Sequence, residues 1–148
     1  MINVYAPNDY CEQEKFIRIL GEKLVSKTDT TKLIISGDWN ATLNKIDKCG
    51  GLPWKETTYR NSIIDLIEEL DLHRQFHADT KLFTYETENS KLKSRTEFFL
   101  VSRPISYNVK RTEVRSFIAP DHKAIFLGME LQSELKRGPG TWKFNNTL

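Results

Sequence analysis

The chain has 148 residues, of which 39% are hydrophobic and 28% are charged, and this composition suits one globular domain with room for a core. The net charge of +2 is too small to indicate nucleic-acid binding by itself. No apolar run approaches the ~18 residues of a membrane span, and Met1 leads directly into a strand-like segment without the layout of a signal peptide. Cys11 and Cys49 show neither metal-ligand spacing nor a disulfide framework, which favours reduced thiols and an intracellular location.

The first half of the chain alternates strand and helix patterns. Residues 2–6 form a buried-strand pattern that ends at a proline, and Asn8 or Asp9 can cap the helix that follows. A second strand is expected at 33–35 and a second amphipathic helix near 59–70. The apolar positions that define the two helix faces are Phe16, Ile17, Leu20 and Leu24, and then Tyr59, Ile63, Leu66, Ile67 and Leu70.

From residue 82 onward the pattern becomes strand-like. The expected strands cover 83–87, 98–101, 109–117 and 123–130, with a polar turn at 89–90. Two strand–helix units followed by several strands predict an α/β layered fold with mixed sheets flanked by helices. Glycine and proline at 138–140 indicate a linker, so the domain is predicted to span 1–132 and the linker 133–148.

Two polar clusters lie at the edges of strand-like segments. Gly37, Asp38 and Asn40 follow the apolar run 33–35, and Asp121 and His122 precede the last strand. If the strand continues through Asp38 and Asn40, their side chains share one face, about 6–7 Å apart. Taken alone, each cluster is more typical of a turn or a solvated loop. Together, their carboxylates, amide and imidazole match the needs of metal-assisted phosphodiester hydrolysis.

These clusters occur within a longer series of motifs that resembles a known family. In chain order the motifs are 3–8 (NVYAPN), 37–40 (GDWN), 83–85 (FTY), 94–100 (SRTEFFL) and 120–122 (PDH). The series is similar to the endonuclease/exonuclease/phosphatase domains, and most of all to the endonuclease domains of non-LTR (LINE-type) retrotransposon polyproteins. Residues 137–146 resemble the segment that leads from the nuclease toward the reverse transcriptase. The resemblance implies the C-terminal half of a four-layer α/β sandwich, with the linker running toward a downstream reverse transcriptase-like region.

The resemblance also implies a role for individual residues. Asp121 would bind Mg²⁺, Asp38 would orient or deprotonate the attacking water, and His122 would donate a hydrogen bond to the phosphate. Glu97 stands where the family usually has an Asp that pairs with this histidine, and misplacement of such a carboxylate by about 1 Å can cost roughly 10²-fold in rate. The remaining implied contacts to the phosphate or the DNA are Asn40, Tyr5, Asn8, Thr84, Ser94 and Arg95.

In the resembling family, two earlier strands supply an asparagine and a metal-binding glutamate, and the chain begins at the strand that follows them. We therefore expect a fragment of a Mg²⁺-dependent DNA endonuclease that holds Mg²⁺ weakly and is inactive alone. Two alternatives stay open: a non-catalytic α/β remnant that binds nucleic acid or a partner, and a repair-type abasic endonuclease or phosphatase on the same fold. DNA is the expected partner and the nucleus is one expected location, whereas the sequence does not indicate an oligomeric state.

Overall fold

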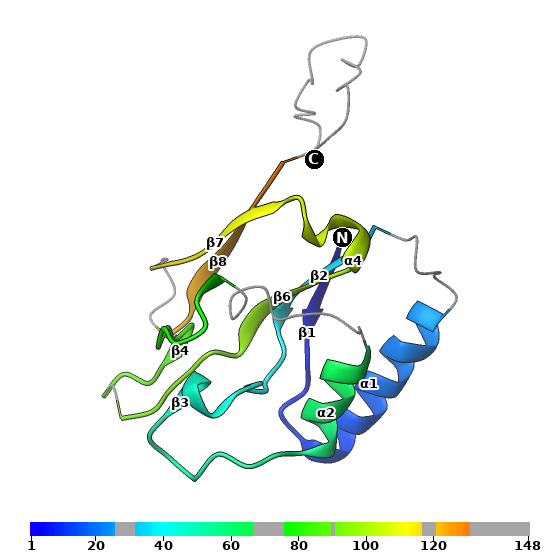
Figure 1. Cartoon of the computed structure of the whole chain (residues 1–148). Coiled ribbons are helices and arrows are strands. Elements are labelled where there is room, and N and C mark those ends of the chain that lie inside the picture. The colour runs from blue at the N-terminus through cyan, green and yellow to red at the C-terminus, as the bar shows by residue number, and fades with distance from the viewer. Residues whose placement is uncertain (26–31, 67–75, 90, 117–120, 131–148) are drawn as a thin grey trace, which may run out of the picture.

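The computed structural model describes residues 1–25, 32–66, 76–89, 91–116 and 121–130 (Figure 1). None of the helices in these ranges is long and apolar enough to cross a membrane. In chain order the elements are β1 (Ile2–Tyr5), α1 (Tyr10–Val25), β2 (Ile34–Asp38), the 3-10 turn η1 (Lys45–Asp47), β3 (Lys48–Cys49), α2 (Thr58–Leu66), β4 (Tyr85–Glu86), β5 (Lys93–Ser94), β6 (Glu97–Val101), α4 (Arg103–Ser106), β7 (Val109–Ser116) and β8 (Lys123–Met129).

A three-stranded sheet in the order β1–β2–β6 forms the centre of the fold. β1 runs parallel to β2, and β2 runs antiparallel to β6. The helix α1 connects the two parallel strands, and Asp9 caps its start because its Oδ1 accepts hydrogen bonds from the backbone N–H of Cys11 (2.9 Å) and of Glu12 (3.2 Å). Helices α1 and α2 pack together over one face of this sheet (Figure 1).

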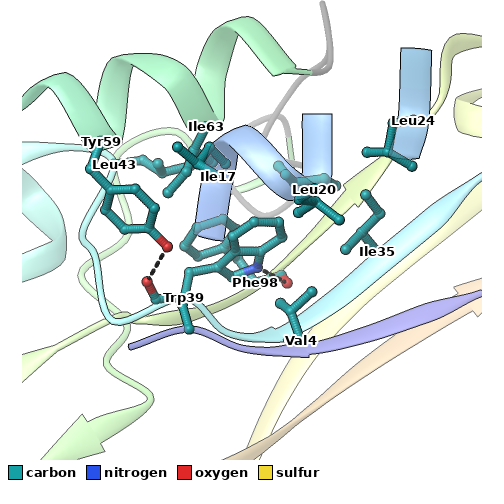
Figure 2. Packing of buried hydrophobic residues seen from close by; sticks show 12 residues of the cluster. Val4, Ile17, Leu20, Leu24, Ile35, Trp39, Leu43, Tyr59, Ile63 and Phe98 are labelled. Carbon is teal, nitrogen blue, oxygen red and sulfur yellow. Dashed lines mark hydrogen bonds between the residues drawn. The ribbon is translucent and has the colours of Figure 1, made fainter. Parts of the chain in front are cut away.

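The main hydrophobic core lies between this sheet face and the two helices (Figure 2). At its centre the rings of Trp39 and Phe98 stack, with centroids 5.4 Å apart and planes only 6° from parallel. The indole N–H of Trp39 donates to the carbonyl oxygen of Phe98 (3.3 Å), and the hydroxyl of Tyr59 donates to the carbonyl oxygen of Trp39 (2.9 Å). The residue between Asp38 and Asn40 is therefore anchored in the core, which fixes where these two polar side chains emerge.

Gly37 allows β1 and β2 to approach closely beside the polar cluster. Its φ is +138°, and a Cβ built on it would lie 1.9 Å from the carbonyl oxygen of Val4. No side chain fits in that space without moving the backbone of one of the two strands. The glycine of the first polar cluster is therefore a packing requirement of the sheet.

The other face of the sheet meets the hairpin β7–β8. Phe99, Val101, Ile105 and Val109 form a second buried cluster, against which apolar side chains of β8 pack. This arrangement places helices, central sheet and hairpin in successive layers (Figure 1). A further small sheet, in the order β3–β5–β4, lies beside the central one.

The structure confirms the predicted α/β class with mixed sheets and helices. Strands at 2–6, 33–35 and 98–101, both helices and the last two strands are present, although the strand expected at 83–87 shrinks to β4. β3 and β5 have two residues each and were not predicted, because such short strands show no hydrophobic periodicity. Residues 67–70 of the second helical pattern and the predicted linker 133–148 lie outside the described residues.

Candidate active site

The polar side chains gather where three strands of the central sheet come to one end. In the sheet register, Tyr5 of β1 is the partner of Asp38 at the end of β2, and Asp38 is the partner of Glu97 at the start of β6. Paired residues of neighbouring strands project their side chains from the same face of a sheet. The three side chains therefore form a row across one face, on the opposite side from the helices.

Glu97 positions His122 beside this row of side chains. Its Oε1 is hydrogen bonded to Nδ1 of the histidine, and its Oε2 accepts a hydrogen bond from the hydroxyl of Thr96 (3.1 Å). With Nδ1–H directed at the carboxylate, Nε2 is the ring nitrogen left to accept, donate or bind a cation. The longer side chain of Glu97, where the family usually has Asp, still reaches the imidazole, so the expected pairing is present.

The segment that carries His122 is hydrogen bonded to β4 and to the residue before it. The backbone N–H of Glu86 donates to the carbonyl oxygen of Asp121 (2.9 Å), and that of Lys123 donates to the carbonyl oxygen of Thr84 (2.7 Å). The rings of Tyr85 and His122 lie 4.9 Å apart at an angle of 52°. Backbone and ring contacts together fix the orientation of the imidazole.

Asp121 lies at the open side of the site. Its carboxylate Oδ2 is 4.0 Å from Nε2 of His122, and its side chain is half exposed. Both oxygens of Glu97 have hydrogen-bond partners, and Asp38 accepts one from a backbone N–H, whereas the carboxylate of Asp121 has no closer partner among the described residues. Asp121 is therefore the carboxylate best placed to meet a ligand from solvent.

We expected Asp38 and Asn40 to share a strand face, and the structure shows that they do not. β2 ends at Asp38, and Asn40 adopts a left-handed backbone conformation with φ of +48°. Its backbone N–H donates to Oδ1 of Asp38 (2.9 Å), and its side-chain Nδ2 donates to the carbonyl oxygen of Ala6 (2.6 Å). The two residues form a tight turn of the kind Asn tolerates. The second N–H of the Asn40 amide remains able to donate to a phosphate oxygen.

The strand ends bring together three groups that fit a cation. Ligand atoms of Asp38, Glu97 and His122 all lie within 4.8 Å of one another. Burial, together with the nearby charge of Glu97, raises the pKa of Asp38, and the N–H of Asn40 and the charge of His122 oppose this only in part. A bound cation would relieve that repulsion. Carboxylate oxygens suit Mg²⁺, and the imidazole also suits softer divalent ions.

The residues predicted to contact DNA fall into two groups. Tyr5 is 76% exposed at the end of the row, and Asn8 is exposed on the loop before α1, so both are accessible to a substrate. Thr84, Ser94 and Arg95, in contrast, are buried.

This burial argues against direct DNA contacts of the Thr84, Ser94 and Arg95 side chains, because side chains enclosed by protein offer little surface to a phosphate. The hydroxyl oxygen of Thr84 accepts hydrogen bonds from the backbone N–H of Thr96 (3.1 Å) and of Glu97 (3.3 Å). Arg95 binds the buried carboxylate of Asp47 through Nε (2.8 Å) and Nη2 (3.1 Å). Both residues position the strand that carries Glu97.

Thr96, Tyr85 and Asp47 belong to the surroundings of the site but were not singled out in the sequence. Thr96 directly precedes Glu97 and Tyr85 directly follows Thr84, so both lay within recognised motifs. Asp47 has no such signal, because its partner Arg95 lies 48 positions away in the chain.

Comparison with solved structures defines the class of fold. The 3'-5' exonuclease of Neisseria meningitidis superposes with a TM-score of 0.70 at 23% identity, covering 87% of this chain and 60% of that one. A structure of that Neisseria enzyme, described as a 3' phosphatase, is bound to a product DNA hairpin. The endonuclease domain of TRAS1, a telomere-specific non-LTR retrotransposon, superposes with a TM-score of 0.58 at 13% identity, covering 81% of this chain and 52% of that one. The chain has the fold of the exonuclease and abasic-site endonuclease enzymes, the endonuclease/exonuclease/phosphatase fold that its motifs indicated.

Comparison of sequences identifies one relative, from a transposon. The transposon TX1 uncharacterized 149 kDa protein of Xenopus laevis is 27% identical over 153 residues, which cover the whole of this chain. The chain spans only 12% of that protein's length and about 60% of the solved exonuclease. No protein-family model matches the sequence.

Proposed function

We propose that this chain carries part of the catalytic site of a metal-dependent DNA endonuclease of the non-LTR retrotransposon type. The observation that supports this most directly is the convergence of Asp38, Glu97 and His122 at one end of the central sheet. The similarity to a transposon protein and the fold shared with nucleases point to the same chemistry.

The reaction is hydrolysis of one phosphodiester bond. Asp38 orients a water molecule and accepts its proton as the water oxygen bonds to phosphorus. His122, held by Glu97 and carrying a proton on both ring nitrogens, donates a hydrogen bond from Nε2 to the phosphate as negative charge builds on its oxygens, and Asn40 adds a second donor. The bond from phosphorus to the leaving oxygen breaks, and that oxygen takes a proton from water. Mg²⁺, with Asp121 as its exposed carboxylate ligand, supplies charge stabilisation when bound.

Mg²⁺ binding by these residues alone is expected to be weak. Mg²⁺ gives up its water reluctantly and relies on well-placed carboxylates, and Asp121 is the one carboxylate of the site without a closer partner in the described chain. In the resembling family a glutamate from an earlier strand is a further ligand. We therefore propose that the 148-residue chain needs such a segment for efficient cleavage.

The test compares nicking of supercoiled plasmid by the 148-residue chain and by a version extended with the upstream strands of the resembling family. The extended protein should nick the plasmid with Mg²⁺ and not with a chelator, and Asp38→Ala, His122→Ala should abolish nicking. Glu14→Gln changes an exposed carboxylate on α1, which covers the opposite face of the sheet, and is the matched control that should nick normally. Nicking by the extended double variant at the native rate would refute the proposed function.

Weak metal binding is tested separately by titrating Mg²⁺ into the 148-residue chain. The chain should bind in the millimolar range, and Asp121→Asn should weaken binding further. Strong binding that survives Asp121→Asn would show that the carboxylates of Asp38 and Glu97 hold the ion instead.

A further inference from the structure

One hydroxyl group of the site has no part in the hydrolysis described for Asp38 and His122. Thr96 lies directly before β6, and its hydroxyl donates a hydrogen bond to Oε2 of Glu97 (3.1 Å). The other oxygen of this carboxylate, Oε1, is hydrogen bonded to Nδ1 of His122. Glu97 therefore bridges the threonine and the histidine, with one carboxylate oxygen on each.

The backbone of Thr96 is held at both of its polar groups. Its N–H donates to the hydroxyl oxygen of Thr84 (3.1 Å), and its carbonyl oxygen accepts from the N–H of Trp39 (2.9 Å). The preceding residue, Arg95, is paired with the carboxylate of Asp47. All four of these neighbouring residues are buried, so the hydroxyl of Thr96 extends from a rigid backbone.

The contact between Thr96 and Glu97 depends on where the strand begins. Successive side chains of a regular strand project to opposite faces of the sheet, which would keep these two neighbours apart. β6 begins at Glu97, so Thr96 lies outside the strand and its side chain can turn towards the same face. Burial raises the pKa of Asp38 and the charge of Glu97 adds to the rise, whereas a hydrogen bond from Thr96 opposes it. The hydroxyl thus lies where the two carboxylates meet.

A glutamate needs such an anchor more than an aspartate does. Its side chain has one more rotatable bond, so its carboxylate can occupy more positions relative to the strand. A hydrogen bond to one partner fixes one oxygen but leaves the plane of the carboxylate able to turn. Two bonds to partners on different segments fix the position and the plane together. This matters here because Glu97 stands where the resembling family usually has Asp.

We propose that Thr96 is a positioning residue, which holds Glu97 so that this carboxylate can orient His122. In this role Thr96 acts on the reaction through Glu97 and needs no contact with the phosphate or with a cation. Without its hydroxyl the carboxylate keeps one partner, and the imidazole departs from the orientation that catalysis needs. A misplacement of about 1 Å can cost roughly 10²-fold in rate. The role in catalysis rests on the proposed function, whereas the effect on the imidazole does not.

The first test observes the ring of His122 in the 148-residue chain, with a chelator present. Nitrogen-15 NMR at alkaline pH, where the ring carries one proton, shows which nitrogen holds it, and His122→Asn assigns the signals. In the native chain this proton should reside on Nδ1, because Glu97 accepts it there. Thr96→Val should lower the ratio of the Nδ1–H form to the Nε2–H form about 3- to 10-fold, the equivalent of one net hydrogen bond. Thr96→Ser keeps the hydroxyl and should restore the native ratio.

Two controls separate positioning from a general loss of stability. Thr57→Val removes another half-buried hydroxyl, which accepts from the backbone N–H of Arg60 (3.2 Å) at the start of α2, and it should leave the ratio unchanged. Glu97→Ala should abolish the preference for Nδ1, and adding Thr96→Val to it should change nothing further. Thr96→Ala takes the place of Thr96→Val if circular dichroism shows the latter to be unfolded.

Three results of this test would overturn the inference. The first is a native ratio in Thr96→Val, and the second is an equal shift in Thr57→Val. The third is a shift by Thr96→Val that persists when the carboxylate of Glu97 is absent, because the hydroxyl would then act on His122 by another route.

The second test measures nicking by the extended protein with Mg²⁺. Thr96→Val should lower kcat about 10-fold or more with KM nearly unchanged, because it disturbs the orientation of His122 and not the binding of DNA. Thr96→Ser should restore kcat, and Thr57→Val should nick as the native protein does. A native kcat in Thr96→Val would overturn the role in catalysis. A raised KM at native kcat would instead show that the threonine binds the substrate directly.

The two proposals fail separately. Nicking that Thr96→Val does not affect, together with an unmoved proton on His122, would remove the role of Thr96 and leave the endonuclease. A proton that moves to Nε2 in Thr96→Val, without any nicking by the extended protein, would remove the endonuclease and leave Thr96 as the residue that holds Glu97 against His122.

Discussion

The buried ion pair between Asp47 and Arg95 provides the sharpest test of how this site is held. The two side chains are 0% and 1% exposed, and the carboxylate of Asp47 accepts bonds from two guanidinium nitrogens and from the backbone N–H of Asn44 (3.1 Å). Asp47→Ala removes all of these acceptors and leaves the guanidinium charge buried. Breaking a buried pair in this way costs about 3–5 kcal/mol. That loss is a large part of the ~5–15 kcal/mol of a typical domain.

The measurement is urea unfolding followed by far-ultraviolet circular dichroism and tryptophan fluorescence. Glu22→Ala is the matched control, because it removes one partner of an exposed pair with Arg18, which contributes under about 1 kcal/mol. Asp47→Leu combined with Arg95→Met should be less destabilised than Asp47→Ala, since no unpaired charge remains. The reasoning is refuted if Asp47→Ala lowers the free energy of unfolding no more than Glu22→Ala does. It is also refuted if the loss in the double variant equals the sum of the losses in Asp47→Leu and Arg95→Met measured singly.

The same variants decide between two roles for Arg95. If Arg95 is only structural, it can be replaced together with Asp47 without loss of DNA affinity, provided that the double variant folds. If Arg95 contacts DNA, the same replacement lowers the affinity. We expect the folded double variant to bind a 12-base-pair duplex as the native chain does, and a tenfold or larger loss would restore the original prediction that Arg95 contacts DNA.

Three further predictions concern the site and its strands. Asp38→Asn should be more stable than the native chain at pH 7 but not at pH 3 in urea unfolding. Burial and Glu97 raise the pKa of Asp38, so the native chain loses stability as the pH rises above the ordinary value of 3.8 and the carboxyl ionises, whereas the neutral Asn does not. Gly37→Ala should cost more than about 3 kcal/mol or prevent folding, seen by circular dichroism, since its Cβ would meet the carbonyl of Val4 at 1.9 Å. Thr84→Val should cost about 1–3 kcal/mol by urea unfolding, because two backbone N–H groups lose their acceptor, and Thr84→Ser, which keeps the hydroxyl, should cost less.

The local pattern of apolar residues was sufficient to predict the longer helices and strands of the fold. The 3.6-residue spacing of apolar side chains predicted α1, and the short apolar run before Gly37 predicted β2, because both elements bury one continuous face along the chain. The motif order was sufficient to link Asp38, Glu97 and His122 as one site. The structure brings these three together from the ends of three separate segments.

Tertiary packing decided what no local pattern contains. The turn at Asn40 arises because its amide reaches the carbonyl of Ala6, 34 residues earlier, and this contact pulls it out of the strand. Arg95 reads in the sequence as a basic residue beside the site, yet it is enclosed because Asp47 folds against it. The two-residue strands exist because each has a partner that is distant or separated by a turn. The sequence by itself determined the helices, the central strands and the identity of the chemical groups, since these depend on neighbours along the chain. Burial, charge pairing and access to solvent depend on neighbours in space, and for that reason only the folded structure decided them.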